Sequence, residues 1–161
     1  MKRTALPTLL CAMLLATPAW TAARVDPLCA PMRTFLTAIK PDTSRVITLH
    51  STWGGGFRRP DGTSDKGAMW AMQCENHDFK PARTLCLALL KTSSREFPGS
   101  TVVRLLACIS PRTRLPTSTM INSVDLDMQF GSDNRGANIN IKLGEDPKLG
   151  GSVLTVTADA Y

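Results

Sequence analysis

The sequence has few of the residues and motifs on which most enzyme active sites depend. Only two histidines, His50 and His77, occur in 161 residues. The serine-hydrolase pattern GxSxG and the phosphate-binding patterns GxxxxGK[ST] and GxGxxG are all absent. No CxxC pair occurs either, so the chain offers no recognisable set of metal ligands. We therefore expect no cofactor, no metal and a function other than catalysis.

Long apolar runs are also missing, and the one short run lies at the N-terminus. Lys2 and Arg3 precede an apolar stretch over 9–16, which is too short to span a bilayer. Thr21 and Ala23 are small enough for the −3 and −1 positions of a signal-peptidase site. We expect residues 1–23 to be a signal peptide and residues 24–161 to form a single domain without a transmembrane segment.

Cys11 within the leader raises the alternative of a lipoprotein. Lipoprotein processing requires a small residue before the cysteine, and Leu10 occupies that position. The expected location is therefore the periplasm or the exterior of the cell, with a cleaved leader and no lipid anchor.

The charge is mildly basic. The whole chain has 19 Lys and Arg against 13 Asp and Glu, a net charge of +6. Loss of Lys2 and Arg3 with the leader lowers this to +4. Such a balance favours an anionic partner such as an acidic protein surface, while the absence of a basic run and the export of the chain argue against nucleic acid.

Four cysteines remain in the mature chain: Cys29, Cys74, Cys86 and Cys108. An even number in an exported protein indicates two disulfides. Four cysteines allow three pairings, and the sequence favours Cys86–Cys108 with Cys29–Cys74 without excluding the others.

Hydrophobic periodicity predicts the elements of the fold. Helical spacing indicates helices over 26–39, where Asp26 and Pro27 begin the first turn, and over about 76–94. Strict alternation predicts strands over 44–53 and 67–75, joined as a long hairpin, and three further strands over 122–130, 137–143 and 152–161. Residues 100–109 fit either a helix or a buried strand, and we expect a strand.

These elements describe an α+β domain with two layers. The expected architecture is a mainly antiparallel sheet of about five to six strands, with a C-terminal meander of three strands. Two helices would pack on one face of this sheet, and the two disulfides would stabilise it.

Three weak catalytic arrangements remain. His50 and His77 could serve a small hydrolase acting on an envelope polymer, although His50 and its neighbour Ser51 lie on opposite faces of a strand. Cys74 lies close to His77, but a disulfide is favoured over a free thiol. Asp125 and Asp127 share one strand face, which is also typical of an ordinary solvated surface.

The most unusual segment is STWGGGFRRPDGTSDKG, residues 51–67. It combines aromatic and arginine side chains, which dominate binding sites between proteins, with glycines that let the backbone approach a partner closely. We expect it to project from the hairpin or, alternatively, to fold back over the sheet edge. The predicted partner-binding residues are Trp53, Gly54, Gly55, Gly56, Phe57, Arg58 and Arg59.

The sequence thus predicts a protein-binding module rather than an enzyme. The leading hypothesis is an inhibitor or immunity protein that blocks a toxin or a cell-wall hydrolase through residues 53–59. The alternatives are the small hydrolase above and a structural or ligand-binding module of the envelope. The sequence leaves the oligomeric state open.

Overall fold

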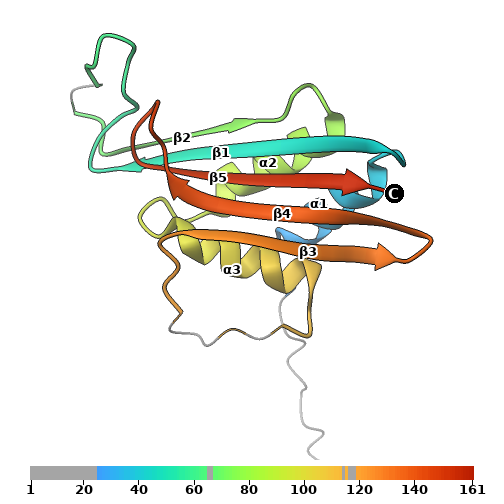
Figure 1. The fold of residues 1–161 in the computed structure, drawn as a ribbon. Coiled ribbons are helices and arrows are strands. Elements are labelled where there is room, and N and C mark those ends of the chain that lie inside the picture. Colours follow the sequence, from blue (N-terminus) through green and yellow to red (C-terminus); the bar gives the residue numbers. More distant parts are fainter. Residues whose placement is uncertain (1–24, 65–66, 114, 116–118) are drawn as a thin grey trace, which may run out of the picture.

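The structure is a computed structural model that describes residues 25–64, 67–113, 115 and 119–161. The predicted signal peptide, residues 1–23, lies outside the described residues. In the described part, one sheet and three helices form a two-layer α+β arrangement (Figure 1).

The sheet has five strands in the order β2-β1-β5-β4-β3, and every neighbouring pair is antiparallel. The strands are β1 Thr43–Trp53, β2 Trp70–Glu75, β3 Val124–Ser132, β4 Arg135–Glu145 and β5 Ser152–Ala160. The hairpin of β1 and β2 and the C-terminal meander of β3, β4 and β5 confirm the pairings that alternation predicts. The segment between β1 and β2, residues 54–69, is called the long loop below.

Alternation along β1 sends side chains to two different environments. Ile47 and Leu49 are buried in the core, whereas His50 lies on the other face. The same division runs through β4 and β5, where alternate residues such as Ile141 and Val156 are buried. Figure 1 shows the helices on one side of the sheet, so the face that carries His50 has no helix over it.

The helices are α1 Cys29–Ala38, α2 Lys80–Thr92 and α3 Pro98–Ile109. The prediction of two helices is wrong because residues 100–109, expected as a strand, belong to α3. Pro98 begins this helix, where its missing N–H costs nothing. Val102, Leu105 and Ile109 all point into the core, and this burial outweighs the small helix penalty of the β-branched residues.

All four mature cysteines form disulfides, but the predicted pairing is wrong. The bonds are Cys29–Cys108 and Cys74–Cys86. Cys108 lies in the last turn of α3, which ends beside the start of α1. Cys86 faces the sheet from α2, directly over Cys74 in β2, so the helical state of 98–109 and the crossing of α2 over β2 decide the pairing.

A second connection links the three helices. Arg104 of α3 donates to both carboxylate oxygens of Asp26, with Nε–Oδ2 at 2.6 Å and Nη2–Oδ1 at 2.9 Å. Its Nη1 donates to the carbonyl of Thr92 at the end of α2 (2.6 Å). The hydrogen bond from Arg104 holds the pKa of Asp26 below its ordinary value. Arg104 therefore joins the start of α1 and the end of α2 to α3.

Removal of Cys29–Cys108 is expected to destabilise the fold more than removal of Cys74–Cys86. The bonds span 79 and 12 positions, for which loop entropy gives stabilisation of about 4.5 and about 2.8 kcal/mol. Urea unfolding of the two double alanine variants measures both losses. If the two variants lose equal free energy of unfolding, or if the Cys74–Cys86 variant loses more, the greater role given to Cys29–Cys108 is contradicted.

Candidate functional site

The base of the long loop is fixed by hydrogen bonds where β1 ends. After Trp53 the chain turns at Gly54, whose φ of +84° is rarely adopted by residues with a side chain. The N–H of Gly54 donates to the carbonyl of Met69 (2.9 Å). The hydroxyl of Thr52 donates to the carbonyl of Gly55 (2.6 Å). The loop therefore leaves the sheet in one defined direction.

The tip of the long loop is a small turn of its own. Arg58 and Ser64 form an antiparallel bridge, and the N–H of Arg59 donates to the carbonyl of Thr63 (2.6 Å). The N–H of Gly62 closes the turn on the carbonyl of Arg59 (2.9 Å). Figure 1 shows this part of the loop extending beyond the end of the sheet. The described part of the tip is therefore ordered and exposed.

The middle of the long loop folds back instead. The ring of Phe57 packs edge-on against His50, with the ring centres 6.5 Å apart, on the face of the sheet without helices. Trp53 shares the other face with Ile47 and Leu49. The structure thus separates the two aromatic residues that the sequence groups together. One part of the loop projects and another part covers the sheet.

His50 and Asp146 form a buried pair beneath Phe57. His50 Nδ1 and Asp146 Oδ2 are 2.6 Å apart, and their side chains are 12% and 3% exposed. His50 Nε2 is itself buried without a hydrogen-bond partner in the described residues, 3.5 Å from Glu75 Oε1. The other oxygen of Asp146 accepts the N–H groups of Lys148 and Leu149, both at 2.9 Å. Both oxygens of the Asp146 carboxylate are therefore satisfied.

The environment of Asp146 favours its ionised form. Burial acts to raise the pKa of Asp146, but the hydrogen bonds from Leu149, His50 and Lys148 outweigh it and lower the pKa below its ordinary value. A carboxylate in this position carries a full negative charge at neutral pH. It can therefore hold both the imidazole and the loop backbone.

The loop between β4 and β5, residues 146–151, connects this pair to the long loop. The carbonyl of Leu149 accepts the N–H of Arg58 at 2.7 Å. Gly151 has a φ of +77°, and a Cβ there would lie only 2.3 Å from the carbonyl oxygen of Ser51. Because of this close approach, the β4–β5 loop rests directly on β1. His50 thus positions two loops, one through Asp146 and the other through Phe57.

A shallow cleft of about 270 Å³ lies between these loops, and we call it the loop cleft. Its walls consist largely of backbone, because six of the lining residues are glycines. Trp53 and Arg58 supply its large side chains. The lining residues are Thr52, Trp53, Gly54, Gly55, Gly56, Arg58, Gly62, Ser64, Leu149, Gly150 and Gly151.

Two exposed tryptophans lie beside the loop cleft on the helix side of the sheet. Trp53 and Trp70 face each other across β1 and β2 and are 54% and 42% exposed. The guanidinium of Arg95 lies 3.5 Å above the ring of Trp70. We call Trp53 and Trp70, with Arg95 over the Trp70 ring, the tryptophan patch.

The paired aspartates of β3 are occupied by neighbouring side chains. The amide of Asn140 donates to Asp125 (2.8 Å) and to Asp127 (2.9 Å), and Lys142 lies 3.2 Å from Asp125. The hydrogen bond from Asn140 is the main cause that lowers the pKa of Asp125. Both carboxylates are exposed, so this arrangement is that of a solvated strand face.

The remaining sequence candidates do not meet. His77 is exposed in the turn before α2, with a φ of +46°. Cys74 is bonded to Cys86 and has no free thiol. In the described residues, no cluster of three or more histidine, cysteine, aspartate or glutamate side chains is arranged to hold a metal ion. None of the described helices has the length and apolar character needed to cross a membrane.

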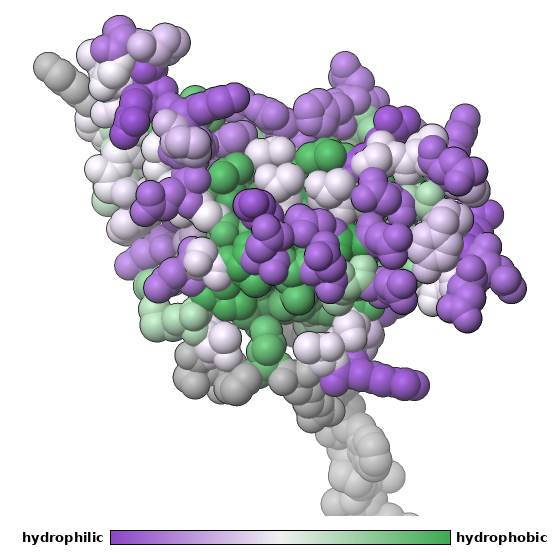
Figure 2. Space-filling view, in the orientation of Figure 1, coloured by the Kyte–Doolittle hydropathy of each residue, from purple (hydrophilic) through white to green (hydrophobic). Residues whose placement is uncertain are grey.

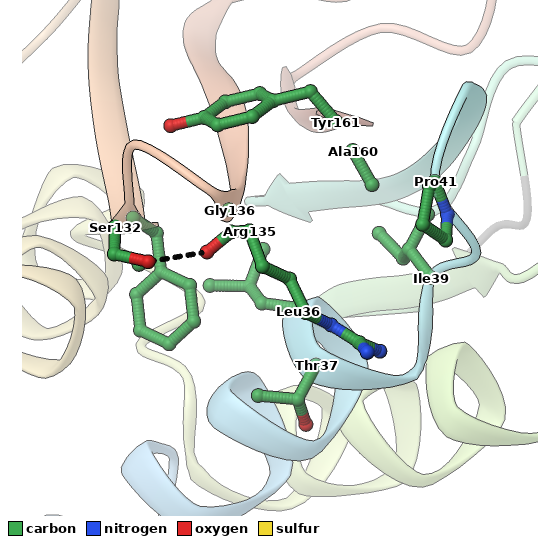
Figure 3. A pocket seen from close by; sticks show the side chains of 11 residues that line it. Leu36, Thr37, Ile39, Pro41, Ser132, Arg135, Gly136, Ala160 and Tyr161 are labelled. Atoms are coloured by element: carbon green, nitrogen blue, oxygen red, sulfur yellow. Dashed lines mark hydrogen bonds between the residues drawn. The ribbon is translucent and has the colours of Figure 1, made fainter.

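A second cavity of about 470 Å³ lies at the opposite end of the sheet, between the end of α1 and the β3–β4 turn (Figure 3). Leu36, Ile39, Phe130 and Tyr161 supply much of its apolar lining. Figure 3 shows the side chain of Arg135 extending along this cavity toward α1. The cavity therefore combines apolar walls with one cation.

Comparison with known proteins gives no relative from which to transfer a function. No family model matches the chain. No curated protein and no solved structure matches it either.

Several residues of the site have little signal in the sequence. Asp146 lies in GEDPKLGG, which predicts a turn and nothing more, and it is 96 positions from His50. Glu75 is the last residue of β2 and Arg95 lies in the connection between α2 and α3, where charged residues are common. The sequence does indicate the position of His50, because alternation along β1 places this histidine on the face opposite to Ile47 and Leu49.

Replacement of Asp146 by asparagine is expected to lower stability at pH 7 by about 1–2 kcal/mol, because charged hydrogen bonds are stronger than neutral ones. Since folding lowers the pKa of Asp146 from an unfolded value of about 3.9, this contribution is complete above that pH and is lost as the pH falls through the folded value. Urea unfolding at pH 7 and pH 3 measures both effects.

Asp159→Asn is the control, because Asp159 is an exposed carboxylate on the sheet face that carries His50. It should change stability by less than about 0.5 kcal/mol at either pH. A loss for Asp146→Asn that is the same at pH 7 and pH 3 would contradict the role given to its charge.

Proposed function

We propose that the chain is an exported protein-binding module that contacts its partner through the loop cleft and the tryptophan patch. The observation that carries this proposal is that Trp53 and Arg58 line one cleft whose two walls are hydrogen-bonded to each other. Both residue types dominate binding between proteins. A cleft that is already ordered loses little conformational entropy when a partner binds.

The exposure of the tryptophan patch supports a protein partner. Large aromatic side chains are usually buried in an isolated domain, and a group of them at one edge is typical of an interaction surface. Arg95 over Trp70 holds one of these rings in place. The backbone walls of the loop cleft also offer N–H and C=O groups to an approaching chain.

Charge favours an acidic partner. Arg58 and Arg95 lie at this end of the sheet, and the whole chain is basic. A carboxylate on the partner could form a two-point hydrogen bond with the guanidinium of Arg58. We therefore propose an inhibitor or immunity protein that blocks the acid-lined site of a toxin or of a cell-wall hydrolase. The two disulfides support action in the periplasm or outside the cell.

The geometry gives less support to a hydrolase that uses His50. The hydrogen bond to Asp146 would orient an imidazole base, as in catalytic triads. However, His50 Nε2, the nitrogen that would take a proton, is buried. A substrate could reach this atom only if side chains around it, such as Glu75 and Phe57, moved away.

Binding should depend on Trp53 and Arg58. A partner captured from an exported-protein extract, then purified, should bind the Trp53→Ala, Arg58→Ala double variant roughly 1,000-fold more weakly, since each residue type often contributes about 2 kcal/mol. Titration calorimetry measures the two dissociation constants. Leu87→Ala is the matched control, because Leu87 is an exposed apolar residue on α2. Equal affinity of the double variant and the control would exclude the loop cleft as the contact surface.

A second candidate function, a ligand-binding envelope module, is favoured by the cavity beside Arg135. Its volume of about 470 Å³ falls in the range of small-molecule sites. Apolar walls and one guanidinium suit an amphipathic anion such as a fatty acid. In the described residues no carboxylate pairs with Arg135, so its charge is available.

Dodecanoate is expected to bind the wild type in calorimetry if this second function holds. Arg135→Gln should weaken binding about 10-fold through loss of a charged hydrogen bond. Arg112→Gln, a change at an exposed arginine outside the cavity, should leave binding unchanged. No heat of binding with the wild type, or equal binding by both variants, excludes this use of the cavity.

A further inference from the structure

The strand β3 is an open edge of the sheet. It pairs with β4 on one side, and no described strand pairs with its other side. It has nine residues and contains no proline. Its outer N–H and C=O groups therefore form a template for another strand.

The opposite edge of the sheet is better protected. The strand β2 has only six residues. A disulfide ties Cys74 of β2 to α2, and Arg95 covers the ring of Trp70. Short length and covering side chains are usual ways to prevent pairing at an edge. In contrast, β3 is longer, and among the described residues no disulfide ties it to a helix.

The apolar row of β3 is also incompletely covered. Val124, Leu126, Met128 and Phe130 are only half-buried, whereas Ile139 and the other apolar residues of β4 on the same face are fully buried. Figure 2 shows hydrophobic residues gathered in the part of this view where Figure 1 draws β3 and α3. The core of the domain therefore reaches the surface along β3.

We propose that a second copy of the chain pairs with this edge, β3 against β3, in an antiparallel dimer. A two-fold axis perpendicular to the sheet would pass beside Met128, the central residue of the strand. The result is a continuous ten-stranded sheet in which the helices of both copies lie on the same face. The two half-buried apolar rows would then meet and exclude water from each other.

The residues of β3 are self-complementary in this register. Each residue faces the one equally far from Met128 on the other copy. Leu126 therefore faces Phe130 on the apolar side. On the polar side Asp127 faces Gln129 and Asp125 faces Gly131, so no two like charges are directly opposed.

Neighbouring registers are less favourable. An axis at Asp127 places the two Asp127 carboxylates opposite each other, and an axis at Leu126 opposes Asp125 with Asp127 twice. An axis at Gln129 shortens the ladder by two residues, whereas the register centred on Met128 uses the whole strand, with Val124 opposite Ser132 at its ends. Directly opposed like charges destabilise a strand pair. The sequence of β3 thus selects the register centred on Met128.

Two substitutions at Gln129 test the proposal, because this exposed residue faces Asp127 of the other copy. Gln129→Lys creates two ion pairs across the axis, and Gln129→Asp creates two like-charge contacts. We expect a concentration-dependent dimer for the wild type, with a dissociation constant about 2- to 30-fold lower for Gln129→Lys and higher for Gln129→Asp. Sedimentation equilibrium measures all three, and thermal unfolding checks that both variants fold.

Cross-linking fixes the register independently. Under mild oxidation, a mixture of Asp127→Cys and Gln129→Cys chains should form a disulfide faster than either variant alone, because only the mixed pair is directly opposed. A wild type that stays monomeric at all concentrations overturns the proposal. It is equally overturned by a dimer that is unaffected by both changes at position 129, or by self-linking as fast as mixed linking.

Discussion

The hydrogen bond between His50 and Asp146 is the interaction on which the candidate site depends. It joins the central part of β1 to the β4–β5 loop, which in turn accepts the N–H of Arg58. Phe57 packs on the same imidazole, so the side chain of His50 contacts both loops. Without this pair, a long loop rich in glycine would have many conformations of similar energy. The loop cleft exists because a buried carboxylate limits that freedom.

The helix layer makes this arrangement possible by leaving one face of the sheet uncovered. Cys29–Cys108 and the contacts of Arg104 hold α1, α2 and α3 together on the other face. The long loop is then the segment that covers His50. Trp53 instead points to the helix side and is exposed there. The same strand end therefore supplies the aromatic patch on one face and the loop support on the other.

The sequence predicted the sheet well, because alternation along Ile47, Leu49 and the C-terminal strands reports directly which face is buried. The prediction failed at residues 100–109. This short apolar segment fits both a helix and a buried strand, and only its packing against α1 decides between the two. The disulfide pairing failed with it, since the helix places Cys108 beside Cys29. The pair of His50 and Asp146 joins residues far apart in the chain, and no local pattern encodes such a contact. Trp53 and Phe57 lie close together in the sequence, but the turn at Gly54 sends them to opposite faces of the sheet, and no local pattern indicates this.

The central claim is that a protein partner is bound at the loop cleft and the tryptophan patch. Amide hydrogen exchange of the chain, free and bound to its partner, tests this claim most directly. The account predicts slower exchange on binding within 52–58, 69–71 and 149–151, and unchanged exchange in α1 and around Arg135. Protection confined to the polar sheet face or to the Arg135 cavity, with 52–58 unaffected, would contradict it.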